Sequence, residues 1–338
     1  MCLKSKLCIL LFLCLSVSVW AQEPFRAMFY NVENLFDTKD DTLKNDNEFL
    51  PAAPKRWTYK RYQDKLTKIS KVIAASGASQ VPDLVGLAEV ENDACLNDLV
   101  NHSPLRAAGY RYVMTDSPDA RGIDVALLYQ RATFKLLQKE EIAIPHETLR
   151  RSPTRNILHV SGKVVYGDTL DIFVCHMPSR AGGEKKSESY RMATCRVLKE
   201  AVDKVMHART HPYVLIMGDF NDFPHNRSLT QVLGAAKPQQ HAASHTLYNL
   251  MIDKQGGTNR YRGEWGILDQ IIVSGTMLQP SSGIQTTPDK AQILRHPFLL
   301  EEDDKYGGLL PSRTYIGMKY HGGFSDHLPV CVDLDITY

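Results

Sequence analysis

The chain has 338 residues, 43% of them hydrophobic, with 40 Lys and Arg against 38 Asp and Glu. This length allows one large domain or two small ones. The formal charge of +2 creates no strong overall field for polyanions, which argues against a protein that holds nucleic acid through net charge alone.

The first element in chain order is an apolar run over residues 7–20, preceded by two lysines. A basic start, a short apolar run and Ala21 at its end predict a secretory signal peptide over residues 1–21. A buried N-terminal helix is the alternative, and Leu13 is too bulky to favour a lipid anchor on Cys14. We therefore expect an exported protein, periplasmic or extracellular.

Residues 22–338 contain no Pro/Gly/Ser-rich linker, repeat or low-complexity tract, and the candidate site residues extend from Asn31 to His327, so we expect one domain. We also expect a monomer without stable membrane insertion. Its basic and acidic residues balance once the two leader lysines are removed. The cysteines show no C-x-x-C spacing, so a zinc site is not expected. Export would make a disulfide chemically possible, but the sequence does not show which cysteines would pair. The mature cysteines are Cys95, Cys175, Cys195 and Cys331.

Hydrophobic periodicity places the remaining elements. It predicts helices over 59–76 and 187–207, a short helix from Asn92, and strands over 26–31, 83–89, 124–129, 134–144, 157–165, 170–175, 213–217, 268–273 and 328–334. Strands 124–129 and 134–144 are expected to be adjacent, and strands 157–165 and 170–175 to form a hairpin. Long helices between groups of strands predict a layered α/β fold, two packed sheets flanked by helices. Segment 286–323 has little periodicity and is either functional or a mobile surface loop.

Polar groups stand where the apolar runs stop. The run 213–217 leads into Gly218-Asp-Phe-Asn221, and the run 328–332 follows Ser325-Asp-His327. Carboxylates clustered at buried strand ends repel one another unless a cation or a proton neutralises them. Oxygen ligands with a nearby imidazole suit Mg²⁺ or Mn²⁺ and phosphate chemistry. The strand ends concerned carry Asn31, Glu89, His176, Asp219, Asp269 and the Asp326-His327 pair.

Each of these residues also has an ordinary structural explanation. Glu91 rivals Glu89, because residues two apart in an extended chain point the same way. By the same rule, Asp219 and Asn221 should face one side. A lone His176 is more often structural than catalytic. The concentration of such groups at buried strand ends nevertheless favours a site, since folding alone penalises it.

The order of these motifs resembles the endonuclease/exonuclease/phosphatase family, with the deoxyribonuclease I-like fold. The resemblance runs from Phe29-Tyr-Asn-Val-Glu33 through Leu87-Ala-Glu-Val90, Cys175-His-Met177, Gly218-Asp-Phe-Asn221 and Leu268-Asp-Gln270 to Phe324-Ser-Asp-His-Leu-Pro329. Further strings look like a bacterial exported branch of that family: 121–129, 176–183 and 260–266. The resemblance implies a four-layer sandwich, two facing mixed sheets between helical layers, with the site at one end.

The resemblance also implies roles. Glu89 looks like the principal metal carboxylate, with Asn31, Glu33 and Asp326 in support. Asp219 is similar to the group that positions or deprotonates the attacking water. The other catalytic positions are Asn221 as a phosphate donor, His327 held by Asp269, and His176 near the phosphate or the leaving oxygen. Arg121, Arg155 and Arg180 are candidates for substrate binding, although the stretch around Arg180 reads equally well as a tight turn.

These expectations describe a secreted phosphoesterase that uses Mg²⁺ or Mn²⁺ on phosphodiester bonds, with a nuclease as the first hypothesis. The alternatives are a phosphodiesterase or phosphatase acting on phospholipid head groups or inositol phosphates, and a binding module that has lost catalysis. If a neutral imidazole is the base, activity should fall below about pH 6.

Overall fold

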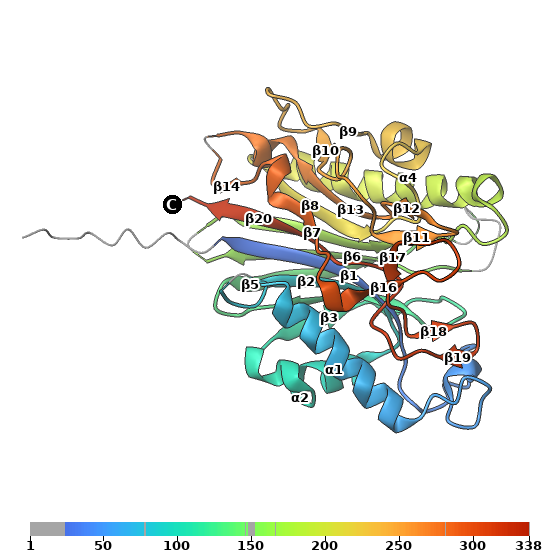
Figure 1. Ribbon diagram of the computed structural model, residues 1–338. Coiled ribbons are helices and arrows are strands. Elements are labelled where there is room, and N and C mark those ends of the chain that lie inside the picture. The colour runs from blue at the N-terminus through green and yellow to red at the C-terminus, as the bar shows by residue number, and fades with distance from the viewer. Residues whose placement is uncertain are drawn as a thin grey trace, which may run out of the picture.

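Two mixed β-sheets face one another in the middle of the molecule, and helices cover their outer faces (Figure 1). The computed structural model describes residues 24–77, 79–145, 147, 153–165, 167–280 and 282–337. The predicted signal peptide and Tyr166 of the predicted hairpin turn lie outside the described residues. None of the helices within these ranges combines the length and apolar character needed to cross a membrane.

The first sheet has the strand order β14-β20-β1-β2-β4-β3, and β15 also pairs with β20. Strand β1 is parallel to β2 and antiparallel to β20. The strands are β1 (Phe25–Leu35), β2 (Leu84–Val90), β3 (Arg111–Met114), β4 (Asp124–Tyr129), β14 (Ile284–Gln285), β15 (Ala291–Ile293) and β20 (Val330–Ile336).

The second sheet has the strand order β5-β6-β7-β8-β13-β10-β9. Strands β7 and β8 are parallel, and β13 runs antiparallel to β8. The strands are β5 (Phe134–Ile142), β6 (Ile157–Val164), β7 (Thr169–His176), β8 (Tyr213–Asp219), β9 (Ala235–Ala236), β10 (Leu247–Asn249) and β13 (Asp269–Ser274).

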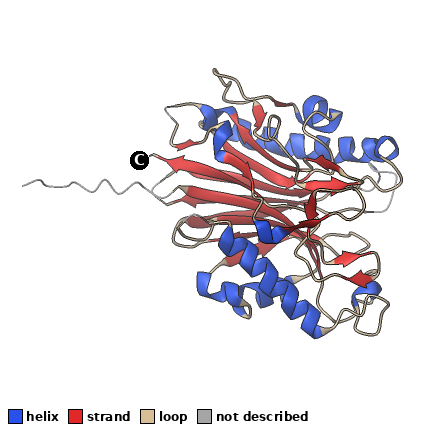
Figure 2. Ribbon diagram, viewed as in Figure 1, coloured by secondary structure: helices blue, strands red, loops and turns tan. Residues whose placement is uncertain are grey.

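Three α-helices and several short hairpins complete the described part of the chain, as Figure 2 shows by secondary structure. The helices are α1 (Tyr59–Ala75), α2 (Asp93–Asn101) and α4 (Glu184–Ala208). The hairpins are β11 (Asn259–Tyr261) with β12 (Glu264–Gly266), β16 (Leu300–Glu302) with β17 (Leu309–Pro311), and β18 (Tyr315–Ile316) with β19 (Lys319–Tyr320). Short helical turns span Asn47–Phe49, Pro104–Ala108, Ser228–Leu233, Gly275–Leu278, Pro288–Lys290 and Pro297–Leu299.

Alternation along the strands explains the layers. In β1, Ala27 and Phe29 belong to the apolar cluster between the sheets, whereas Met28 and Tyr30 belong to the cluster under α1 and α2. All four side chains are buried, so β1 is apolar on both faces, as a sheet covered on both sides requires. A third cluster joins the second sheet to α4. The predicted four-layer arrangement is therefore confirmed.

Two expectations about the strands need correction. The runs 124–129 and 134–144 are not sheet neighbours, because β4 pairs with β2 and β3 while β5 pairs with β6 in the other sheet. The chain therefore crosses between the sheets after Tyr129. The expected list of strands also lacks β3, which is four residues long and partly or fully exposed. The segment 286–323 contains short strands and turns that reach from β15 to β19.

Candidate active site

One row of residues across the second sheet carries three of the predicted site residues. His176 is the last residue of β7, Asp219 the last of β8, and Asp269 the first of β13. The strand register pairs His176 with Asp219 and Asp219 with Asp269, so the three lie side by side at one end of the sheet. All three are at most 5% exposed. Their apolar strands thus deliver three polar groups to one buried place.

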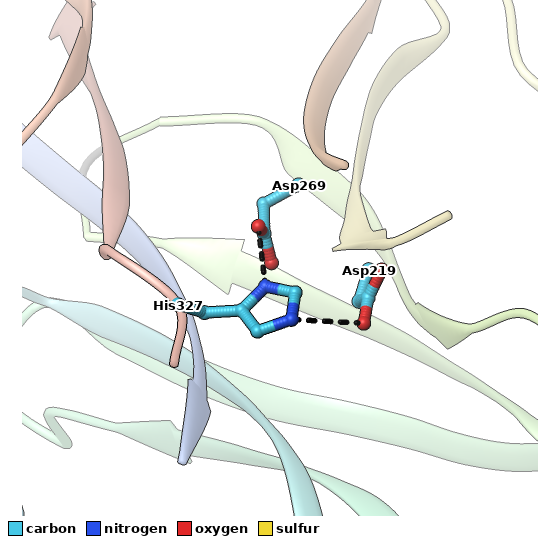
Figure 3. A group of neighbouring side chains, drawn as sticks. All are labelled: Asp219, Asp269 and His327. Atoms are coloured by element: carbon cyan, nitrogen blue, oxygen red, sulfur yellow. Dashed lines mark hydrogen bonds and ion pairs between the residues drawn. The ribbon is translucent and has the colours of Figure 1, made fainter. Parts of the chain in front are cut away.

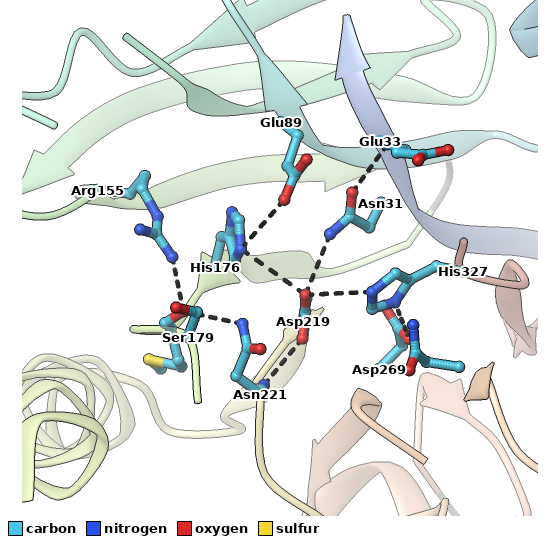
Figure 4. A network of polar contacts seen from close by, with 12 residues as sticks. Asn31, Glu33, Glu89, Arg155, His176, Ser179, Asp219, Asn221, Asp269 and His327 are labelled. Carbon is cyan, nitrogen blue, oxygen red and sulfur yellow. Dashed lines mark hydrogen bonds and ion pairs between the residues drawn. The ribbon is translucent and has the colours of Figure 1, made fainter. Parts of the chain in front are cut away.

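The first sheet meets this row at Asp219. Asn31 of β1 donates a hydrogen bond from Nδ2 to Oδ2 of Asp219, over 3.1 Å. Its own Oδ1 accepts the backbone N–H of Glu33 at 3.0 Å, which fixes the amide orientation. Asp219 is therefore the point at which side chains of both sheets converge (Figure 4).

Glu89 reaches the site through an unusual backbone conformation. Its φ is +66°, in the left-handed region, and the pairing of β2 with β4 shifts between Ala88 and Val90. Glu91 consequently does not point the same way, and its carboxylate accepts the N–H of Asp37 at 2.6 Å. The equivalence of Glu89 and Glu91 expected from an extended chain is wrong, because the bulge at residue 89 breaks the alternation.

Left-handed non-glycine residues gather at this place. Glu33, Asn34, Glu89 and Asn221 all have φ between +49° and +66°. Such residues cost of order 1–3 kcal/mol each, and they persist only where the surrounding structure holds them. Their clustering at the strand ends, outside any glycine-rich turn, marks a part of the fold shaped for chemistry.

Asp219 and Asn221 belong to a tight turn, so their predicted extended geometry is also wrong. Asn221 has a φ of +49°, and its backbone N–H donates to Oδ1 of Asp219 at 2.8 Å. Its side-chain Nδ2 donates to the carbonyl of Met177 at 3.1 Å. Both residues still reach the site, but the turn rather than the strand period brings them there.

His327 bridges the two aspartates, as Figure 3 shows. Its Nδ1 lies 2.7 Å from Oδ2 of Asp269, and its Nε2 lies 3.7 Å from Oδ2 of Asp219. Burial acts to lower its pKa, but the two neighbouring carboxylates prevail and raise the pKa of His327 well above its usual value. This imidazole is therefore charged near neutral pH, and the neutral base assumed from the sequence is not what the surroundings favour.

His176 faces the same carboxylate as His327, but its ring is neutral whereas the ring of His327 is charged. Its Nε2 lies 3.7 Å from Oδ2 of Asp219 and 3.8 Å from Oε1 of Glu89. Burial, with the charges of Arg155, Arg121 and His327, lowers its pKa well below the usual value, so this ring is neutral. Burial also raises the pKa of Asp219 to about 7. Titratable neighbours whose pKa values are driven apart are typical of acid–base sites.

The three predicted arginines differ in their surroundings. Arg121 is half exposed, with its guanidinium 3.7 Å from Oε1 of Glu89. Arg155 is buried, pairs with Asp119 at 3.2 Å and donates to the Met177 carbonyl at 2.6 Å. Arg121 thus lies on the solvent-exposed side of Glu89, at the mouth of the site, whereas Arg155 is buried beside Met177.

Arg180 contacts the loop after β8. It donates to the carbonyl of Asn221 at 2.7 Å and to Oδ1 of Asn226 at 3.1 Å, and it stacks on Phe223. These contacts favour a role in holding that loop, and the predicted contact of Arg180 with substrate stays a prediction.

Glu33 and Asp326 share one cation that sequence reasoning missed. Arg313 lies 3.3 Å from Oε1 of Glu33 and 3.1 Å from Oδ2 of Asp326. The segment around Arg313 has no hydrophobic periodicity, so the sequence pattern did not predict a place for Arg313 in the site. Lys65 of α1 was missed as well: it is buried and donates to Thr314 Oγ1 at 2.6 Å. Its position on the buried face of a helix was the one available signal.

The donor set fits a divalent cation. Within the described part of the chain, ligand atoms of Asp219, Asp269 and His327 all lie within 4.8 Å of one another. Oδ1 of Asp269 is buried and has no hydrogen-bond partner, which leaves an oxygen without compensation. The two carboxylates are oxygen ligands that Mg²⁺ or Mn²⁺ accepts, whereas the imidazole binds a metal only after losing its proton. These three residues form a candidate metal site, and Glu89 stands on the other side of His176.

A model of the endonuclease/exonuclease/phosphatase family matches residues 26–336. No curated protein sequence matches the chain.

Several solved structures share the fold. D. rerio TDP2 complexed with a single-strand DNA product is 16% identical, with 92% of this chain and 98% of that chain covered and a TM-score of 0.53. The human Nocturnin catalytic domain with bound sulfate is 16% identical, with 93% and 95% covered and a TM-score of 0.54. The mannosyl-6-phosphatase Bt3783 of Bacteroides thetaiotaomicron is 16% identical, with 92% and 99% covered and a TM-score of 0.54.

At this level of identity the solved structures support the fold alone, whereas the match to the family model supports membership of the family. The two sheets, the helical layers and the buried Asp219, Asp269 and His327 agree with both. The chain belongs to the endonuclease/exonuclease/phosphatase family and has the fold of its metal-dependent phosphoester hydrolases.

Proposed function

We propose that this protein hydrolyses phosphodiester bonds with the help of a divalent cation, and that nucleic acid is its first candidate substrate. The observation that carries the proposal is the position of one buried carboxylate, Asp219, between the neutral imidazole of His176 and the charged imidazole of His327. A structural ion pair needs one partner, whereas an acid–base site needs groups with different proton affinities.

Asp219 is the proposed positioning group for the attacking water. Its two oxygens are held by Asn31 and by the backbone of Asn221, so the carboxylate is fixed before substrate arrives. A pKa of about 7 lets it accept a proton near neutral pH. The water attacks phosphorus, its proton passes to Asp219, and the bond from phosphorus to the leaving oxygen breaks as that oxygen takes a proton from solvent.

The two imidazoles divide the remaining work. His327, charged and held by Asp269, stabilises negative charge as it develops on the phosphoryl group. His176, neutral and adjacent to Glu89, accepts or donates a hydrogen bond at the same group. Arg121 at the mouth adds a cation for the phosphate.

We assign the cation to Glu89, with Asn31 beside it, rather than to the Asp219, Asp269 and His327 group. Nδ1 of His327 already contacts Asp269 at 2.7 Å, and a protonated imidazole does not bind metal. Among the described residues, the ion-pair contacts of Oε1 of Glu89 are long, 3.7 Å to Arg121 and 3.8 Å to His176. A bound divalent cation supplies Lewis-acid polarisation of a phosphoryl oxygen. Glu33 and Asp326, both paired with Arg313, are supporting groups in this assignment.

A phosphatase acting on small phosphorylated polyols, inositol phosphates or lipid head groups is the second candidate. The balanced charge of residues 22–338 favours it, as does the likeness of fold to a mannosyl-6-phosphatase. The likeness to a TDP2 structure with single-strand DNA product favours nucleic acid. A binding module without catalysis does not account for the opposed imidazoles.

Export, a single domain over 22–338 and action as a monomer remain part of the proposal. The basic, apolar N-terminal sequence supports export. Every proposed catalytic and metal-side group comes from one chain, and both sheets contribute, which supports one undivided domain. Fractionation of cells that produce the full chain tests export, because a cytoplasmic, uncleaved protein contradicts it.

A substrate panel tests the activity. Plasmid DNA, RNA, bis-p-nitrophenyl phosphate, sphingomyelin and inositol phosphates are each incubated with Mg²⁺ and with EDTA. We expect Mg²⁺-dependent hydrolysis of bis-p-nitrophenyl phosphate and of nucleic acid. Hydrolysis of the former without the latter moves the second candidate into first place, and no turnover of any phosphate ester contradicts both.

A further inference from the structure

A polar cavity of about 200 Å³ lies beside the proposed site. Three separate segments supply its wall: the end of β1, the loop before α1, and the stretch that leads into β18. The lining includes Glu33, Asn34, Phe49, Lys55, Arg313 and Tyr315. The proposed mechanism uses Glu33 of this wall as a supporting group, and it gives no role to the space itself or to Lys55.

The cavity shares its wall with the proposed catalytic groups. The backbone N–H of Asn34 donates to Oε2 of Glu89 at 3.0 Å, so one residue faces both places. Arg313 lines the cavity and also contacts Asp326, next to His327, at 3.1 Å. The cavity and the proposed site therefore adjoin each other through Asn34 and Arg313.

Lys55 is the least compensated cation of the cavity wall. Its Nζ lies 2.7 Å from Glu48, but the Glu48 side chain is 59% exposed. An ion pair with so exposed a partner contributes little and yields readily to a better anion. Arg313, by contrast, already serves the two carboxylates of Glu33 and Asp326.

The cavity is built before any ligand arrives. Phe49 and Tyr315 are both under 9% exposed and meet edge to face, with ring centroids 6.4 Å apart. Nζ of Lys55 rests 4.2 Å from the Phe49 ring centroid, so the aromatic face directs the ammonium. Glu33 does not oppose an anion strongly, because it accepts the Thr314 N–H at 2.6 Å and pairs with Arg313.

We propose that this cavity binds a second phosphate group of the substrate, with Lys55 as its main contact and Arg313 in support. Lysine binds phosphate as a compact point charge, and a preformed cavity lowers the cost of fixing the ligand. The inference rests on the proposed function, because it takes the neighbouring site as the place of the phosphate that is hydrolysed. The second phosphate is either the next one along an oligonucleotide or another on a small polyol.

Binding without turnover tests the subsite. The full-length Asp219→Asn protein, loaded with Mg²⁺, is titrated calorimetrically with two matched ligand pairs. One pair is a thymidine dinucleotide with and without a 5′-phosphate, and the other is inositol 1,4-bisphosphate and inositol 1-phosphate. We expect the additional phosphate to tighten binding about tenfold or more in at least one pair. The pair that shows the gain identifies the source of the phosphate.

Variants then connect the gain to the cavity. In the same Asp219→Asn protein, Lys55→Gln should abolish most of the gain and Lys55→Arg should restore part of it. Lys237→Gln is the control for loss of a lysine charge, because Lys237 also pairs with a carboxylate, Asp253 at 2.8 Å, but is exposed and does not line the cavity. It should leave the gain unchanged.

Two results overturn the subsite: equal affinity with and without the additional phosphate in both pairs, or a Lys55→Gln effect that is the same for both members of a pair. The ligand comparison in the Asp219→Asn protein needs no cavity variant, so a misfolded Lys55→Gln protein does not block the test. Failure of the proposed function has a different signature, namely no turnover of any phosphate ester by the wild-type protein.

Discussion

His327 and Asp219 face each other across the space between the two sheets, with Nε2 of the imidazole 3.7 Å from Oδ2 of the carboxylate. Asp269 holds the other ring nitrogen at 2.7 Å, so the ring presents one fixed edge to Asp219. Ser325 fixes the loop that carries His327, because its Oγ donates a hydrogen bond to the Asn31 carbonyl and accepts one from the His327 N–H. The imidazole edge is thereby tied to both sheets.

Replacing Asp219 by Asn should lower kcat/KM for bis-p-nitrophenyl phosphate by about 10²–10⁴-fold, because the proton acceptor is lost while the shape is kept. Steady-state kinetics measures the effect, and circular dichroism checks the fold. Asp335→Asn, at an exposed position of β20, serves as control and should match wild type. Turnover by Asp219→Asn at the wild-type rate removes Asp219 from the mechanism.

The two candidate metal positions predict different thermal shifts. If Glu89 holds the cation, Mg²⁺ raises the Tm of wild type and of Asp269→Asn but not that of Glu89→Gln, since only binding to the native state stabilises. EDTA should cancel the shift. The reverse pattern, a shift kept by Glu89→Gln and lost by Asp269→Asn, places the ion among Asp219, Asp269 and His327 instead.

The left-handed backbone at residue 89 predicts that Gly and Ala exchange their usual order of stability at this position. In an ordinary strand Gly is less stable than Ala by roughly 0.5–1 kcal/mol. At a φ of +66° the order should reverse, so Glu89→Gly should be about 1 kcal/mol more stable than Glu89→Ala in urea unfolding. Ala88→Gly in the same strand is the control and should be destabilising. A Glu89→Gly protein less stable than Glu89→Ala refutes the strain.

Glu91 predicts a dependence of stability on pH. Burial raises the pKa of Glu91 to about 8 in the folded protein, against an ordinary value of 4.5. The folded state therefore holds a proton that the unfolded chain releases, and the stabilisation, complete below about pH 4.5, is lost as pH rises through about 8. Glu91→Gln should flatten this decline. Urea unfolding of both proteins between pH 5 and pH 9 measures it, and parallel curves contradict the prediction.

Arg191 and Asp222 form a buried ion pair behind the Asn221 turn. Both side chains are at most 1% exposed, and Nε lies 2.7 Å from Oδ1. Arg191→Met removes the nearer cation from the buried carboxylate, which keeps a 3.4 Å contact with Arg180, and should lower the free energy of unfolding by about 3 kcal/mol. The double variant Arg191→Met/Asp222→Asn should recover part of that loss, because no unpaired charge remains. An additive double variant argues against direct coupling.

Much of the fold could be predicted because its strands are apolar on both faces. Runs such as 213–217 and 124–129 stand out in the sequence and became β8 and β4 within two residues. These runs did not show that β4 and β5 belong to different sheets. Periodicity indicates which residues are buried, but it does not indicate which neighbouring strand or helix buries them.

The candidate site divides along a similar line. The strand ends at His176, Asp219 and Asp269 were visible because an apolar run stops there. The separation of Glu89 from Glu91 was not, because it depends on a left-handed backbone that non-glycine residues adopt only under tertiary constraint. Arg313 lay in a segment without any pattern, and only the folded chain brings it to Glu33.

The four thiols of the described chain offer a way to watch the layers separate. Cys95 and Cys331 lie in the cluster beneath α1 and α2, and Cys175 and Cys195 lie in the cluster beneath α4. All four are buried and free. A thiol reagent added to the native protein therefore reacts only when a layer lifts, and peptide mapping of the labelled cysteines distinguishes the two sides. The molecule carries its own reporters of which outer layer opens first.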